Sequence, residues 1–131
     1  MRFLHCSDVH VTQDYAKTPL RALGWRRSIA MLEHTIGGRA NAYRHAKETL
    51  YRIASDVARH KADHLLVTGD LTGYATDEEF ASAREALGCI ADSSATCSVV
   101  PGNHDCFTPN AVRTRRFEKH FGHLLQSDMP E

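Results

Sequence analysis

Three groups of polar residues in this sequence combine side chains that bind metal ions or transfer protons. In chain order they are Asp8 with His10, Asp70, and Asn103-His104-Asp105. Carboxylate oxygen and imidazole nitrogen together suit borderline divalent metals such as manganese, iron or zinc. Each group taken singly also fits an ordinary polar loop. The elements around them must therefore decide whether they form one site.

Each polar group directly follows a short apolar run that predicts a β-strand. We expect these strands over residues 2–7, 63–68 and 96–100. The carboxyl ends of parallel strands open to the same edge of a sheet, so residues far apart in sequence meet there. Asp8 and His10 are two positions apart at a strand end, which lets both side chains point to one side and converge on one ion.

Helical patterns separate the predicted strands. Apolar residues between 41 and 60 fall on one helical stripe, and Thr76 with Glu79 has the spacing of a capping box, so we interpret the acidic turn at 77–79 as structural. A further amphipathic helix is expected over residues 112–125, and one or two short helices within 12–39. The strand and helix order predicts an α/β fold with parallel β-α-β-α-β-α order.

Composition narrows the functional classes. The 131 residues suit one domain, and 16 basic against 16 acidic residues give no signal for nucleic acid or an anionic membrane. No apolar run is long enough to span a bilayer, and the run at the amino terminus turns polar too soon for a signal peptide. We therefore expect a cytoplasmic location. Four cysteines without C-x-x-C spacing indicate neither a zinc knuckle nor a redox pair.

Together the three groups resemble the signature of the calcineurin-like metallophosphoesterase family. The family's Asp-x-His, Gly-Asp and Gly-Asn-His-Asp blocks match Asp8-Val9-His10, Gly69-Asp70 and Gly102-Asn103-His104-Asp105. A looser likeness to cyclic-nucleotide phosphodiesterase-like members bears only on the substrate. The resemblance implies a metallophosphoesterase-type α/β sandwich, of which this chain covers the amino-terminal half.

The resemblance also implies the roles of individual residues at two divalent metal ions. Asp8 and His10 would bind the first ion, Asp70 would bridge both, and Asn103 would bind the second. The ions, manganese, iron or zinc, would hold a phosphomono- or phosphodiester and lower the pKa of a bridging water to form hydroxide. His104 would act as general acid or stabilise charge, and Asp105 would orient His104 and raise its pKa.

The sequence departs from the family pattern in its last part. Family members complete both metal shells with a later His and a Gly-His-x-His block, whereas Gly122-His123-Leu124-Leu125 lacks the second His. His120 and His123 are the residues of this chain that could substitute. We therefore expect 1–131 to be a phosphoesterase domain incomplete at its carboxyl end, completed by a further segment or a complementing chain.

Two other functions remain open at this point. One is a non-catalytic interaction module that keeps the fold, as in the phosphoesterase-like subunit of retromer. The other is a structural site in which Asp8, His10 and Asp70 hold a single metal and stabilise the fold without turnover.

Overall fold

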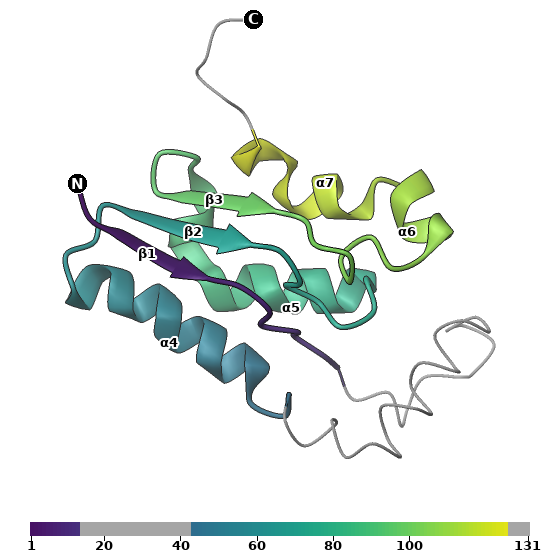
Figure 1. The fold of residues 1–131 in the computed structure, drawn as a ribbon, viewed down its shortest axis with the longest axis horizontal. Helices are drawn as coiled ribbons and strands as arrows, with labels where there is room; N and C mark the ends of the chain where they lie inside the picture. Colours follow the sequence, from purple (N-terminus) through teal and green to yellow (C-terminus); the bar gives the residue numbers. More distant parts are fainter. Residues whose placement is uncertain (14–42, 126–131) are drawn as a thin grey trace, which may run out of the picture.

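The computed structural model describes residues 1–13 and 43–125, and Figure 1 shows the elements in chain order. The strands are β1 Phe3–Cys6, β2 His64–Thr68 and β3 Cys97–Val100. The α-helices are α4 Ala46–Arg59, α5 Asp77–Leu87, α6 Pro109–Arg113 and α7 Arg116–Phe121, with short 3₁₀ helices η2 Gly88–Asp92 and η3 Gly122–Leu124. The helices expected within 12–39 fall almost entirely outside the described residues.

The three strands form one parallel sheet in the order β1-β2-β3. Leu4 of β1 is in register with Leu65 of β2, which is in register with Cys97 of β3. Each strand lies within its predicted range. The α/β prediction is confirmed, because parallel strands alternate with helices along the chain.

Helix α4 follows the apolar stripe seen in the sequence. Its buried residues are Ala46, Leu50, Ala54 and Val57. These positions lie on one face of a helix with 3.6 residues per turn, so burying them places α4 along the sheet. The helix begins only at Ala46, because the chain from 43 to 45 forms a turn.

Helix α5 begins with the capping box predicted from Thr76 and Glu79. The Thr76 hydroxyl accepts a hydrogen bond from the Glu79 amide at 3.1 Å, and the Glu79 carboxylate accepts one from the Thr76 amide at 3.0 Å. The same carboxylate also accepts a hydrogen bond from the Tyr74 amide, which is why Glu79 can be fully buried. The structural interpretation of this acidic turn is confirmed.

The last helical region differs from the single helix expected over 112–125. It is divided into α6, α7 and η3, and the break lies at Arg115, whose φ of 48° is left-handed. Helix α6 starts earlier than expected because the Thr108 hydroxyl caps it and Pro109 takes its first position. The amphipathic pattern holds in part, since Phe117, Phe121 and Leu124 are buried, whereas Val112 and Leu125 are exposed.

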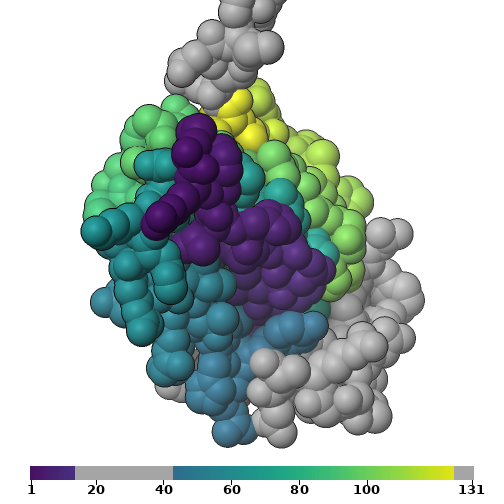
Figure 2. All heavy atoms as spheres, turned by 60° about the vertical axis from the view of Figure 1, so that its left-hand side comes forward, coloured from purple at the N-terminus to yellow at the C-terminus, as the bar shows by residue number. Residues whose placement is uncertain are grey.

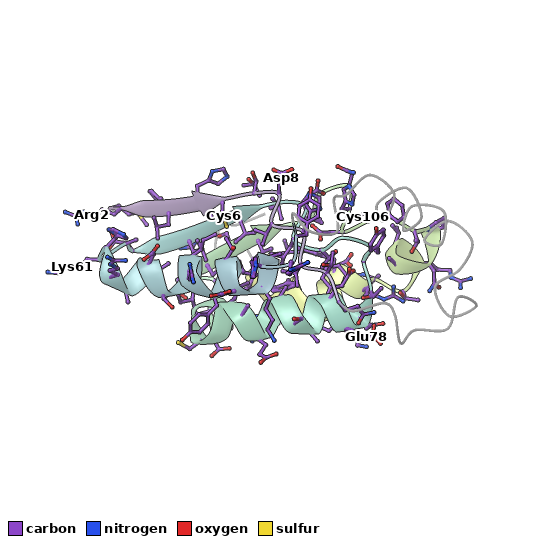
Figure 3. All side chains as sticks on the ribbon, turned by 90° about the horizontal axis from the view of Figure 1, so that it is seen from below. Arg2, Cys6, Asp8, Lys61, Glu78 and Cys106 are labelled. Carbon is purple, nitrogen blue, oxygen red and sulfur yellow. The ribbon has the colours of Figure 1, made fainter. Side chains whose placement is uncertain are left out.

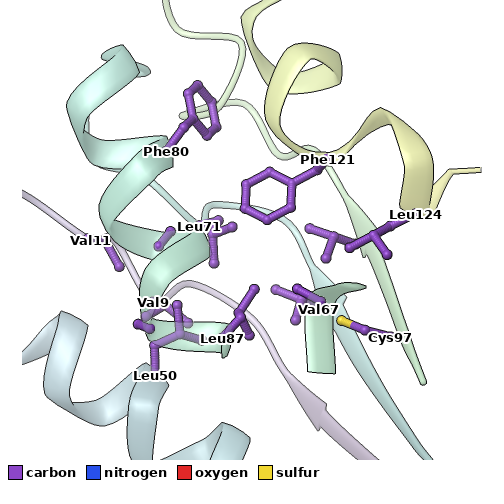
Figure 4. Close-up of a cluster of buried hydrophobic side chains, with 14 of the residues drawn as sticks. Val9, Val11, Leu50, Val67, Leu71, Phe80, Leu87, Cys97, Phe121 and Leu124 are labelled. Carbon is purple, nitrogen blue, oxygen red and sulfur yellow. The ribbon is translucent and has the colours of Figure 1, made fainter. Parts of the chain in front are cut away.

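The hydrophobic core lies between the sheet and the helices on one of its faces, as Figures 3 and 4 show. Phe80 and Leu87 of α5 meet Phe121 of α7 over Val67 and Cys97 of the strands. Side chains on the opposite face include Phe3 and Val100, which are 53% and 46% exposed. The described helices thus leave part of that sheet face open to solvent.

No helix in 1–13 or 43–125 has the length and apolar character that a bilayer crossing requires.

Candidate metal centre

The three polar groups do meet at the carboxyl edge of the sheet. Asp8, His10 and Asp70 each offer a ligand atom, and these atoms all lie within 4.8 Å of one another. Asp8 is exposed, His10 is buried and Asp70 is half-buried. In Figure 3, Asp8 and Cys106, which follows the third group, lie toward one end of the sheet, while Arg2 and Lys61 lie at the other. Two carboxylates and an imidazole at this separation can hold one divalent cation.

Backbone hydrogen bonds join the first two loops beyond the strands. The His10 amide donates to the Asp70 carbonyl at 2.9 Å, and the Val11 amide donates to the Leu71 carbonyl at 2.8 Å. An isolated parallel bridge between Val11 and Thr72 continues the pairing. The spacing between the ligands of the first loop and Asp70 is therefore fixed by main-chain geometry.

All three candidate ligands have left-handed backbone conformations. The φ angles are 55° at Asp8, 53° at His10 and 52° at Asp70. Asp and His tolerate this region better than most residues, yet it still costs of the order of 1 kcal/mol per residue. Such strain persists where the surrounding structure enforces it, and here it turns all three side chains toward one point.

Gly102 allows the third loop to approach Asp70 closely. A Cβ atom on Gly102 would lie 2.2 Å from Asp70 Oδ1 and 2.4 Å from the Asp70 amide nitrogen. The His104 amide donates to Asp70 Oδ1 at 2.8 Å. Asn103 lies between Gly102 and His104 in this loop and is exposed.

The Asp105 carboxylate accepts hydrogen bonds from groups of the second and third loops. Asp105 Oδ1 accepts hydrogen bonds from the Thr72 amide and hydroxyl, both at 2.9 Å, and Oδ2 accepts from the amides of Leu71 and Gly102 at 3.1 and 3.0 Å. Its carboxylate is 1% exposed and joins the second loop to the third. A buried carboxylate takes the nearest unpaired amides, because leaving those donors unbonded is costly.

A main-chain carbonyl orients the ring of His104. Its Nδ1 lies 2.8 Å from the Gly73 carbonyl oxygen. Because a carbonyl only accepts, Nδ1 carries the proton and Nε2 is the ring atom that can face a ligand. The ring also stacks on Phe107, with centroids 5.8 Å apart.

The ring of the candidate ligand His10 contacts two further rings, those of His104 and Tyr43. The His104 and His10 ring centroids are 4.6 Å apart, and those of His10 and Tyr43 are 4.8 Å apart. Sequence reasoning missed Tyr43, Thr72 and Gly73 as parts of the site. Thr72 and Gly73 lie two and three positions after Asp70 of the Gly-Asp block, but nothing marks Tyr43 in the sequence.

The environment of His10 favours its metal-binding form. Burial lowers the pKa of His10, and His104 lowers it further, whereas the carboxylates of Asp70, Asp8 and Asp105 act in the opposite direction. The net effect is a pKa below the ordinary value. The neutral imidazole is the form that coordinates metal, so the donor set fits a divalent cation.

The two histidines considered as substitute ligands are held by other groups. His120 Nε2 lies 3.4 Å from Asp77 Oδ1 and its ring stacks on Phe80. His123 Nε2 lies 2.8 Å from the Ala91 carbonyl oxygen. Neither belongs to the ligand cluster found among the described residues.

Comparison with known proteins addresses the ancestry of this arrangement. The family model described as calcineurin-like phosphoesterase matches residues 1–129. No curated protein and no solved structure gives a significant match. The matched range contains every described element and all three polar groups at the sheet edge. The chain therefore belongs to the calcineurin-like phosphoesterase family.

Proposed function

We propose that this chain carries the metal-binding half of an enzyme that hydrolyses phosphomono- or phosphodiesters at a dinuclear site. The observation that supports this most is the convergence of Asp8, His10 and Asp70 within 4.8 Å. Family membership supplies the reaction class, metal-dependent phosphoester hydrolysis. Two bound divalent ions would supply a nucleophile at neutral pH and neutralise charge on the phosphoryl oxygens.

Within this proposal Asp8 and His10 would hold the first ion, Asp70 would hold both ions, and Asn103 would hold the second. Asp70 can bridge because a carboxylate has two oxygens. The His104 amide already bonds Oδ1, which fixes the carboxylate's rotation. Asn103 is the neighbour of His104 in the loop held against Asp70, which is why we assign it to the same ion.

His104 handles the proton at the leaving oxygen. The Gly73 carbonyl accepts its Nδ1 hydrogen and keeps Nε2 directed away from that contact. A proton on Nε2 can then pass to the departing alkoxide, and the same carbonyl stabilises the positive ring before the transfer. Asp105 acts as a positioning residue, since it holds Leu71, Thr72 and Gly102 around the site.

The remaining ligands come from a segment or chain that complements this one. The set of two carboxylates, one imidazole and one amide is small for two ions, and His120 and His123 are bonded elsewhere. A cytoplasmic location, manganese, iron or zinc as the metals, and completion of the domain beyond this half are parts of the same proposal.

The test compares the chain with its Asp70→Asn variant. In the presence of the complementing segment or chain, we expect manganese-dependent hydrolysis of bis-p-nitrophenyl phosphate with the wild type and its loss with Asp70→Asn. The matched control is Asp92→Asn, which changes an exposed carboxylate paired with Arg84 and should keep full activity. Equal turnover by wild type and Asp70→Asn would reject the assignment of Asp70.

Calorimetric titration with manganese separates the alternative functions. Thermal unfolding with manganese completes the comparison. If manganese raises the unfolding temperature of the wild type but not of Asp70→Asn, and neither hydrolyses the substrate, the site is a structural metal site or a half-site that needs its complement. The absence of both binding and hydrolysis would favour a non-catalytic interaction module.

A further inference from the structure

A pocket opens beside the candidate metal centre, between the end of β1 and the first two turns of α4. Its volume is about 260 Å³. The residues lining it include Ser7, Asp8, Val9, Tyr43, Thr49 and Ile53. In Figure 2 the purple residues after β1 lie next to the blue residues that begin α4. The loop that carries the metal ligands therefore forms one wall, and α4 forms the other.

Two residues connect this pocket to the metal centre. Asp8 lines the pocket and belongs to the ligand cluster. Tyr43 lines the pocket and also packs against His10, with ring centroids 4.8 Å apart. A phosphoryl group held at the metal centre would therefore place its organic substituent at the pocket entrance.

The size of the pocket suits one ring. A cavity of about 150 Å³ accommodates benzene, and pockets for drug-sized ligands begin at about 300 Å³. The volume of about 260 Å³ lies between these limits.

The lining favours an uncharged group. The negatively charged residue in the lining is Asp8, whose carboxylate belongs to the metal centre. The other ionisable ring of the lining, His45, has its Nδ1 3.5 Å from Glu48 Oε2. Val9 and Ile53 supply an apolar surface, while Ser7 and Thr49 supply hydroxyls. An uncharged ring with few polar substituents matches both parts.

We propose that this pocket binds the organic group of the phosphoester, an uncharged single ring such as an aryl or sugar group, and thereby selects the substrate. The inference rests on the proposed phosphoesterase function and deepens it. Tyr43 is the specificity residue, because its ring closes the pocket on the side of His10.

The test measures binding with probes that cannot be hydrolysed. Phenylphosphonate and methylphosphonate share the same head group and differ in the ring. We titrate each into the zinc-loaded chain and follow the amide resonances of Thr49 and Ile53 by NMR. The wild type should bind phenylphosphonate about tenfold more tightly, given five extra carbon atoms at the efficiency usual for ligands.

A filled pocket provides the decisive comparison. Thr49→Tyr places a ring in the pocket from an exposed helix position, whereas Ala58→Tyr places the same ring at an exposed position of α4 outside the pocket. Thr49→Tyr should bind the two probes equally, and Ala58→Tyr should keep the tenfold preference. The proposal is overturned if the wild type shows no preference, binds neither probe, or if Thr49→Tyr keeps the preference.

The hydrolysis assay reports separately on the proposed function. Preferential binding of phenylphosphonate by a chain that hydrolyses nothing would sustain the pocket and reject catalysis by this chain alone. Hydrolysis of bis-p-nitrophenyl phosphate by a chain without the preference would sustain catalysis and reject the pocket.

Discussion

Replacing Gly102 by alanine adds a single methyl group and should weaken metal binding at the candidate metal centre. The added Cβ would lie 2.2 Å from Asp70 Oδ1 and 2.4 Å from the Asp70 amide nitrogen, whereas ordinary contacts begin at 3.4 Å. The backbone of the third loop must therefore retreat from Asp70 by about 1 Å. That retreat breaks the hydrogen bond from the His104 amide to Asp70 Oδ1, which is 2.8 Å long.

The size of the effect follows from this displacement. Metal ligands tolerate errors of about 0.2 Å, and loss of an outer contact to a ligand typically costs about 10- to 100-fold in metal affinity. Overpacking in a close-packed region also destabilises a fold by about 1–3 kcal/mol. We therefore expect Gly102→Ala to lower the affinity for manganese at least about tenfold and to lower the free energy of unfolding measurably.

Gly122→Ala is the matched control. A Cβ at Gly122 would lie 3.5 Å from Glu118 Cβ, an ordinary contact, and the Gly122 backbone is helical. This variant should bind manganese as the wild type does and gain up to about 1 kcal/mol of stability. Calorimetric titration and urea unfolding of both variants provide the measurement. If Gly102→Ala matches the wild type in both assays, the close approach at Asp70 does not position the site.

Two further predictions concern stability. Asp105→Asn replaces a carboxylate oxygen that accepts two amide hydrogen bonds by an amide group that donates, so the free energy of unfolding in urea should fall by about 1–3 kcal/mol. The control Asp92→Asn should lower it by at most about 1 kcal/mol. Equal losses in the two variants would contradict the role of Asp105 in joining the second and third loops. Burial raises the pKa of Asp77, but the His120 hydrogen bond and the charges of Arg116 and Lys119 outweigh it and leave the pKa lowered. The stabilisation from Asp77 is thus present above its unfolded pKa and lost as the pH falls through its folded pKa, so Asp77→Asn should reduce the difference in unfolding free energy between about pH 7 and pH 3; an unchanged difference would refute this reading.

The strands, the stripe of α4 and the capping box of α5 were predictable because each depends on residues close in sequence. Thr76 and Glu79, for example, are three positions apart, and the side chain of each accepts a hydrogen bond from the backbone amide of the other. The convergence of Asp8, His10 and Asp70 followed from one further rule, the common direction of parallel strands.

Details of the site were not predictable because they depend on loop conformations. The partner of His104 is a carbonyl of the second loop, and Asp105 faces amides of that same loop. The second loop begins with a left-handed backbone at Asp70, which its residue type permits but does not demand. The break at Arg115 belongs to the same class, since a left-handed arginine has no signal in the sequence.

The pairing of β1 with β2 has a consequence for the timing of folding. Phe3 is in register with His64, 61 positions later. On the ribosome, where about 5–20 residues are added each second, β1 therefore emerges seconds before its neighbour exists. Asp8 and His10 remain a solvated peptide during that interval, and closing so long a loop is a slow, late step compared with forming α4 or α5. A metal ion present during synthesis can bind tightly only after β2 has docked, so loading of the centre reports the completion of the sheet.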